Sequence, residues 1–247
     1  MAYVEVLNSS KGGPSCSKSI DLQVGCSNKC IGCYAKYTSR MGEKFFTDPV
    51  VREFNDEVFR KSIKKTLKQG YSIARYGKHS DCGSDNFIRT NIKAINIASE
   101  EGFKFVFVSK SLGFNEEVAK SLKDGDHILH ISLGMKTKAR SNEDRVKTFE
   151  SYSEYGVNSK LRITDDITKP LDNIYNYVAK YYKNDTIVTP LRLRSKDEAK
   201  EYNADLNNYS WTSGYYRPRV NHKSWDCFRY YCGEVDGITK CCNCKTL

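Results

Sequence analysis

Short apolar runs typical of β-strands alternate with helix-like patterns through most of the chain. The strand-like runs cover residues 19–24, 71–76, 103–109, 127–133, 159–164 and 186–193, and apolar residues at helical spacing lie between them. Gly70, Gly102 and Gly156 each separate a helical pattern from the next strand, as expected of residues that end a helix. Six such units predict one α/β domain with a parallel sheet and right-handed connections.

Six units are two fewer than a closed eight-fold barrel needs, so we expect an open partial (β/α)6 barrel of parallel strands. Alternation along the strands assigns Leu129, Ile131 and Leu133 to the helix-covered face. The side chains that this alternation turns inward are Asp21, Gln23, His130, Ser132, Arg162, Thr164, Arg192 and Arg194. Such an interior is polar and cationic, which suits a charged ligand. A register error of one residue would reverse these faces.

The composition places the chain among globular proteins. It has 247 residues, of which 39% are hydrophobic and 28% charged. No apolar run approaches the roughly 18 residues of a membrane span, and the first residues lack the pattern of a secretory signal. We therefore expect a cytoplasmic protein, in which clustered cysteines bind metal or carry out redox chemistry. Eight of the ten cysteines fall in two groups, at 26–33 and 227–244.

The first group consists of Cys26, Cys30 and Cys33, directly after the first predicted strand. Loops at the carboxyl ends of parallel strands build active sites. Three thiolates on one loop can hold an iron–sulfur cube and leave one iron without a protein ligand. The alternative is structural zinc completed by Cys16 or His79, although structural zinc favours paired CxxC sequences.

The segment CSNKCIGC, in the loop after the first strand of a βα series, resembles the CxxxCxxC signature of the radical S-adenosylmethionine (radical-SAM) superfamily, in particular its short phage- and bacteria-borne members. The resemblance covers roughly residues 15–200. It implies that the three cysteines hold a [4Fe–4S] cluster whose open iron binds SAM. It also implies reductive cleavage of SAM to a 5′-deoxyadenosyl radical, and an electron donor such as flavodoxin or ferredoxin. Gly32 replaces the usual aromatic residue, and Tyr34 is the candidate for a position near adenine.

The resemblance also implies SAM contacts at the ends of later strands. Ser80 and Asp81 occupy the place of the glycine-rich segment that receives the SAM amino group, although a helix-capping loop around Ser84 or Asp85 is an equal alternative. Lys110 is expected to pair with the SAM carboxylate, Ser132 to bond the ribose, and Arg162 to project into the same cavity. For His130 and Cys82, buried structural roles are favoured over catalytic ones.

The second cysteine group follows the last β-α unit, so the expected division is a core at 1–200 and a tail at 201–247. Cys227, Cys232, Cys241 and Cys244 could bind a second metal, with Cys242 as an alternative to Cys241. An auxiliary iron–sulfur cluster is favoured over structural zinc. Such a site would replace the hydrophobic core that this short segment lacks.

Aromatic and basic residues are interleaved in the first half of the tail. They are Tyr209, Trp211, Tyr215, Tyr216, Arg217, Arg219, His222 and Lys223. The whole chain has a formal net charge of +10, and together with this segment that charge favours a nucleotide, nucleic acid or other anionic substrate. The alternative role is packing over the barrel mouth. Two other functions stay open: a radical-SAM enzyme that modifies a peptide or protein, and a zinc-stabilised nucleic-acid-binding protein without catalysis.

Overall fold

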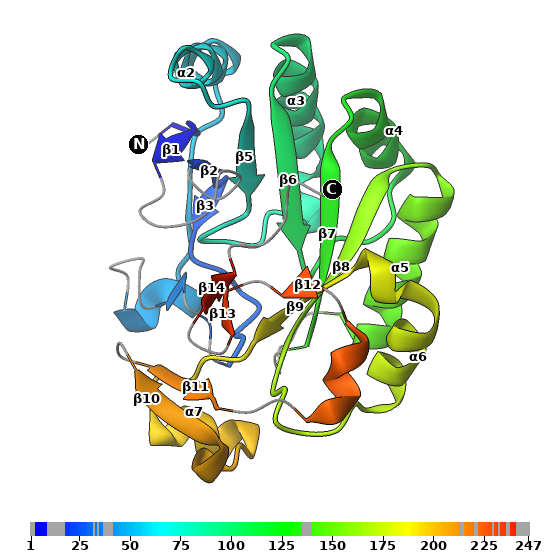
Figure 1. The fold of residues 1–247 in the computed structure, drawn as a ribbon. Helices are drawn as coiled ribbons and strands as arrows, with labels where there is room; N and C mark the ends of the chain where they lie inside the picture. Colours follow the sequence, from blue (N-terminus) through cyan, green and yellow to red (C-terminus); the bar gives the residue numbers. More distant parts are fainter. Residues whose placement is uncertain are drawn as a thin grey trace.

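The computed structural model contains an open eight-stranded sheet with the strand order β1-β2-β5-β6-β7-β8-β9-β12 (Figure 1). Its strands are β1 (Leu7–Asn8), β2 (Lys18–Ile20), β5 (Ile73–Tyr76), β6 (Lys104–Ser109), β7 (Ile128–Gly134), β8 (Asn158–Asp165), β9 (Thr186–Pro190) and β12 (Tyr230–Tyr231). β1 is antiparallel to β2, and the other seven are parallel. The structure describes residues 3–8, 18–31, 33, 35–36, 42–134, 140–212, 215–219, 222–228, 230–231, 233–235 and 238–240.

Five helices cover the outer face of this sheet (Figure 1). They are α2 (Asp56–Lys68), α3 (Ile88–Glu100), α4 (Glu116–Asp124), α5 (Asn142–Glu154) and α6 (Asn173–Tyr182). Asn55, Asn115, Ser141 and Asp172 cap four of them, because each side-chain oxygen accepts a hydrogen bond from a first-turn N–H. After α2, α3 and α5 the chain turns through glycines with positive φ, at Gly70, Gly102 and Gly156. The predicted partial barrel of alternating strands and helices is therefore confirmed.

The predicted faces of the central strands are also confirmed. Leu129, Ile131 and Leu133 of β7 are buried in the main core, together with Val146 and Phe149 of α5. On the opposite face of β7, Ser132 lines a pocket and His130 is fully buried. Alternation along these strands thus separates an apolar outer face from a polar inner face.

The first predicted strand, at 19–24, is two strands in the structure. β2 ends at Ile20, and β3 (Gln23–Val24) pairs antiparallel with β4 (Val50–Val51) in a separate sheet. At the break, the Asp21 carboxylate accepts a hydrogen bond from the His79 backbone N–H at 2.7 Å. The chain therefore leaves the parallel sheet at Asp21, and the cysteine motif follows β3.

The last predicted strand, at 186–193, is shorter than expected. β9 ends at Pro190, and Leu191 and Leu193 pack in a second small core with Ala199, Tyr202 and Tyr209. Arg192 and Arg194 therefore lie beyond the end of the strand whose alternation was expected to turn them inward. The Leu191 N–H still donates to the Asp165 carbonyl of β8 at 2.9 Å, but Leu193 exchanges backbone hydrogen bonds with Tyr216, so the chain leaves the parallel sheet after Pro190.

The segment after residue 195 contains short elements that the sequence did not predict. They are α7 (Lys196–Tyr202), the hairpin β10 (Tyr209–Thr212) and β11 (Tyr215–Pro218), the added strand β12, and the hairpin β13 (Gly233–Val235) and β14 (Ile238–Lys240). Trp225 and Phe228 belong to the main core. Over the described residues, no helix is long and apolar enough to span a membrane.

Candidate functional site

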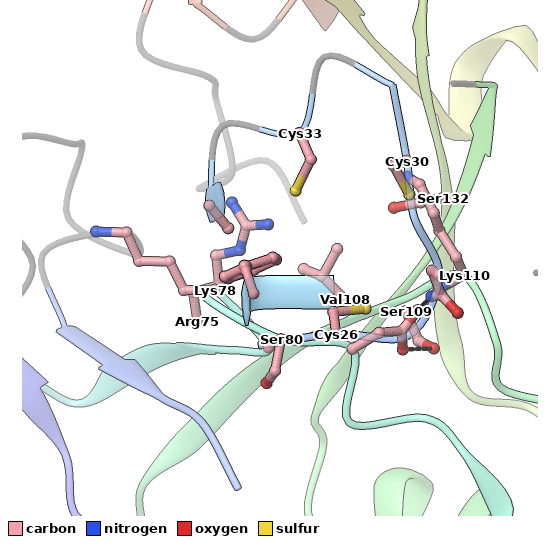
Figure 2. A pocket seen from close by; sticks show the side chains of 15 residues that line it. Cys26, Cys30, Cys33, Arg75, Lys78, Ser80, Val108, Ser109, Lys110 and Ser132 are labelled. Atoms are coloured by element: carbon pink, nitrogen blue, oxygen red, sulfur yellow. Dashed lines mark hydrogen bonds between the residues drawn. The ribbon is translucent and has the colours of Figure 1, made fainter. Parts of the chain in front are cut away.

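A pocket of about 540 Å³, which includes its open mouth, lies where the parallel strands end (Figure 2). Its wall combines the cysteine motif with residues that lie in the last part of β5, β6 and β7 or follow β5 and β6. The lining side chains include Cys26, Asn28, Cys30, Cys33, Phe45, Arg75, Lys78, Ser80, Asp81, Val108, Ser109, Lys110 and Ser132. All three motif cysteines therefore border one cavity, together with four of the five predicted SAM-binding residues that the structure describes.

The motif loop is held by close backbone contacts. Gly25 has φ of +101°, and a Cβ there would lie 2.8 Å from the Phe45 carbonyl oxygen. The Cys26 N–H donates to that same oxygen at 2.9 Å. The loop thus begins with a turn that favours glycine, which directs the cysteines into the pocket.

The three thiols differ in exposure. Cys30 is buried, whereas Cys26 and Cys33 are partly exposed. Burial, assisted by the Asp81 charge, raises the pKa of Cys26 to about 12, and burial also raises the pKa of Cys33. No group of three or more His, Cys, Asp or Glu residues in the described ranges is gathered tightly enough for one metal ion. A cube attaches each thiolate to a different iron, and its positive irons favour the ionised thiols, so three cysteines around one cavity fit a cluster.

Ser80 and Asp81 lie in the pocket wall, as the sequence predicted, but their side chains have partners within the protein. Ser80 Oγ donates to Asp21 Oδ1 at 3.1 Å. The Asp81 carboxylate is buried and accepts five hydrogen bonds, including one at 2.8 Å from the Asn28 amide in the motif loop. Direct contact of either residue with SAM stays a prediction.

Lys110 and Ser132 are brought into the same pocket, at the ends of β6 and β7 (Figure 2). Burial lowers the pKa of Lys110, and the neighbouring Cys30 opposes that shift. Arg162, in register with Ser132 on β8, does not line the pocket, but it is near His130 and, with burial, lowers the His130 pKa. Their roles toward SAM stay predictions.

Sequence reasoning missed Arg145 of α5, which is buried beside this site. Its Nη1 donates to the Ser132 carbonyl at 3.3 Å and to Asn142 Oδ1 at 3.2 Å. Its positive charge is close enough to influence Lys110. An arginine within a helical pattern usually lies on the solvent-exposed face, so the sequence carried no signal for this position.

Several predicted residues lie outside the described ranges. They are Cys16, Tyr34, Cys232, Cys241, Cys242 and Cys244. Of the predicted second metal site, only Cys227 is described: it is exposed, and its Sγ donates to the Ser224 carbonyl at 3.2 Å. The second metal site therefore stays a prediction.

In the aromatic and basic segment, some side chains are buried and others are exposed. Tyr209 is buried in the small core. Trp211 is 57% exposed on the β10–β11 hairpin and meets Tyr216 edge to face at 4.7 Å. The Arg194 guanidinium lies 4.2 Å from the Tyr215 ring centre. Tyr209 thus has a packing role, whereas the binding of an anionic ligand by the exposed residues stays a prediction.

Similar folds occur among solved structures at low sequence identity. One is TsrM from Kitasatospora setae, a radical S-adenosylmethionine methyltransferase whose structure contains cobalamin and a [4Fe–4S] cluster. Its sequence is 13% identical to this chain, and the TM-score is 0.53. The match covers 72% of this chain and 37% of TsrM. SuiB from Streptococcus suis, solved with S-adenosylmethionine bound, is 11% identical with a TM-score of 0.51 over 75% of this chain and 42% of its own. No family model matches the sequence, and no curated protein matches it.

This chain therefore has the fold of radical-SAM enzymes, and it spans about two fifths of the length of these two proteins. The resemblance inferred from CSNKCIGC is confirmed at the level of the fold. The three cysteines lie at the edge of the sheet where that resemblance places them.

Proposed function

We propose that the protein is a radical-SAM enzyme with a [4Fe–4S] cluster on Cys26, Cys30 and Cys33. The observation that supports this most is the lining of one pocket by all three motif cysteines at the carboxyl edge of a parallel sheet. The cluster would supply the electron that cleaves SAM into methionine and a 5′-deoxyadenosyl radical, which removes a hydrogen atom from the substrate. A flavodoxin or ferredoxin would reduce it.

The residues around the pocket would bind and orient SAM. Lys110 is the candidate partner for its carboxylate and Ser132 for its ribose, since both side chains enter the pocket from strand ends. Arg162 would contribute positive charge from the neighbouring strand, and Tyr34 would contact adenine. Phe45 is buried and lines the pocket, where its ring would help to exclude water from the bound cofactor.

We further propose an anionic substrate, with a nucleotide or nucleic acid favoured. Arg75, His130 and Arg162 share the inner face of the sheet, and burial with these two arginines lowers the pKa of His130. Both His130 ring nitrogens are buried without a hydrogen-bond partner in the described part of the chain. Of these three residues Arg75 lines the pocket, and an anion bound there would accept hydrogen bonds from its guanidinium group. Exposed Trp211 and the Arg194–Tyr215 pair could bind further bases and phosphates.

Replacing Cys26, Cys30 and Cys33 by alanine together should remove about four irons per chain. The Cys33→Ala variant alone should lose cleavage of SAM, because one cluster ligand is missing. Iron analysis after anaerobic purification and measurement of 5′-deoxyadenosine after reduction check both expectations. Full activity of Cys33→Ala would contradict the proposed function, and colourless wild-type protein with zinc alone would favour the non-catalytic alternative.

The triple variant also tests the second metal site, which we propose on Cys227, Cys232, Cys241 and Cys244. An auxiliary cluster there would leave about four irons in the triple variant, whereas structural zinc would leave one zinc and no iron. A metal-free triple variant would contradict the second site.

The substrate class is tested by salt dependence. Affinity for a single-stranded oligonucleotide, measured by fluorescence anisotropy, should fall steeply as salt rises, because cationic side chains displace counterions from phosphates. Trp211→Ala should weaken this binding by about 1–3 kcal/mol if a base stacks on the indole. Salt-insensitive binding, or none, would favour a peptide or small-molecule substrate. Deuterium transfer into 5′-deoxyadenosine would then identify the substrate.

A further inference from the structure

We infer that Asp81 is a positioning residue, whose carboxylate holds the cysteine loop against the ends of the neighbouring strands through Asn28. The importance of this loop rests on the proposed function, but the contacts themselves do not. Asn28 stands between Cys26 and Cys30 in the sequence, so a restraint on its side chain also restrains the two cysteines.

The Asp81 carboxylate connects three separate loops. Its Oδ2 accepts hydrogen bonds from the Asn28 amide at 2.8 Å and from the backbone N–H groups of Lys110 and Ser111 at 2.8 and 3.1 Å. Its Oδ1 accepts from Ser109 Oγ at 2.6 Å and from the Gly83 N–H at 3.1 Å. Asp81 is only 9% exposed and Asn28 only 8%, so water competes little for these bonds.

On the side of Asp81 away from Asn28, the loops after β5 and β6 are packed closely together; we call these two loops the framework. Ser109 Oγ also accepts hydrogen bonds from the backbone N–H groups of Ser111 and Leu112. A Cβ at Gly83 would lie 2.0 Å from this same Oγ, so the loops after β5 and β6 meet too closely for a larger residue. The framework is therefore the fixed side of the contact, and Asn28 is the point where the cysteine loop is attached to it.

This arrangement gives Asp81 a role different from the direct SAM contact that the sequence suggested. A carboxylate offers about four lone-pair sites, and five donors already use them. An ammonium group could bind only by displacing one of these donors. We therefore assign binding of the SAM amino group to other atoms of the site, and loop positioning to Asp81.

The contact can be tested in the full chain after chelation of any metal, because it does not require the cluster. In Asn28→Ala, the rate of Cys30 alkylation by iodoacetamide, followed by mass spectrometry, should rise about tenfold, since a hydrogen bond to a buried charge is lost. Asn28→Asp preserves the side-chain size and places two carboxylates together, so its rate should rise at least as much. Alkylation of fully buried Cys82 reports global unfolding and should stay slow in both variants.

Asn91→Ala is the matched control. Asn91 is another fully buried asparagine, which bonds Tyr76 Oη and the Cys82 carbonyl but is not in contact with the cysteine loop through any described hydrogen bond. This variant should lower stability without raising the alkylation rate of Cys30 relative to Cys82. Equal Cys30 rates in Asn28→Ala and wild type, or an equal rise in Asn91→Ala, would overturn the inference.

A second measurement separates this inference from the proposed function. After anaerobic reconstitution, Asn28→Ala should shift the midpoint potential or the EPR spectrum of the reduced cluster, and Asn91→Ala should not. If wild type takes up no iron, the proposed function fails, while the alkylation rates still decide whether Asp81 holds the loop. If wild type takes up iron and Asn28→Ala matches it in both measurements, only the inference about Asp81 fails.

Discussion

Two buried histidines, His127 and His130, oppose folding when they are protonated. His127, just before β7, accepts a hydrogen bond from the Phe105 N–H at Nδ1 and meets Ser99 Oγ at Nε2, each at 2.9 Å. Burial lowers the pKa of His127 to about 4. Burial, with Arg162 and Arg75, lowers the pKa of His130 well below its ordinary value. The folded protein therefore holds both rings neutral, whereas unfolded histidine takes up a proton near pH 6.5.

The free energy of unfolding should consequently fall as the pH drops from about 6.5 toward 4. In this window the unfolded chain binds more protons than the folded chain, so stability rises with pH. For His127 alone the loss between pH 7 and pH 5 is about 2 kcal/mol. Urea unfolding at the two pH values measures it. His127→Gln should show a smaller difference than wild type, and equal differences in the two proteins would contradict this assignment.

Among the elements, helix α2 illustrates how one side chain before a helix stabilises the whole element. Asn55 Oδ1 accepts hydrogen bonds from the N–H groups of Glu57 and Val58, both at 3.1 Å. Asn55→Ala should lower the free energy of unfolding by about 1 kcal/mol, because these N–H groups lose their acceptor. Asn55→Asp keeps an acceptor and should stay near wild type. Urea denaturation compares the three proteins, and an unchanged midpoint in Asn55→Ala would contradict this role.

The elements of the sheet could be predicted from sequence because each strand has a local pattern. Alternation identified the inner and outer faces of β7, and glycines marked the ends of α2, α3 and α5. The break of the first strand at Asp21 and the end of β9 at Pro190 were missed. The apolar alternation continues past both points, although the hydrogen-bond partners of the backbone change there. β12 was missed because two residues carry no periodic signal.

The site was predictable where the residues lie close together in the sequence. The spacing of Cys26, Cys30 and Cys33 was visible, and the ends of β6 and β7 indicated Lys110 and Ser132. The contact between Asn28 and Asp81 joins residues 53 positions apart, and Arg145 reaches β7 from a helix. Such contacts depend on packing in three dimensions, so a single sequence gave no evidence for them.

At the scale of the whole molecule, two residues of the segment after residue 200, Trp225 and Phe228, pack in the main core. Trp225 is 1% exposed, its ring packs against Tyr175 and Phe228, and its Nε1 donates to the Lys169 carbonyl at 2.7 Å. The division at residues 200 and 201 stays a prediction, and Trp225 and Phe228 share one hydrophobic core with residues before it.

Trp225→Ala should lower the free energy of unfolding by about 3–5 kcal/mol, because it removes a large buried side chain and leaves a cavity. Trp211→Ala is the matched control in the same segment, since Trp211 is 57% exposed and its removal should change stability by less than about 0.5 kcal/mol. Urea denaturation measures both. Equal effects of the two substitutions would show that Trp225 adds little to the core.

The late position of β12 in the chain has a consequence for how the protein is made. β12 pairs with β9 and covers what would otherwise be the edge of the sheet. Synthesis proceeds from the N-terminus, so every nascent molecule exposes the β9 edge until residues 230 and 231 have been added. An uncovered edge strand can pair with another chain. Mutations that weaken β12 should therefore reduce the yield of native protein during synthesis, even when they leave the mature pocket intact.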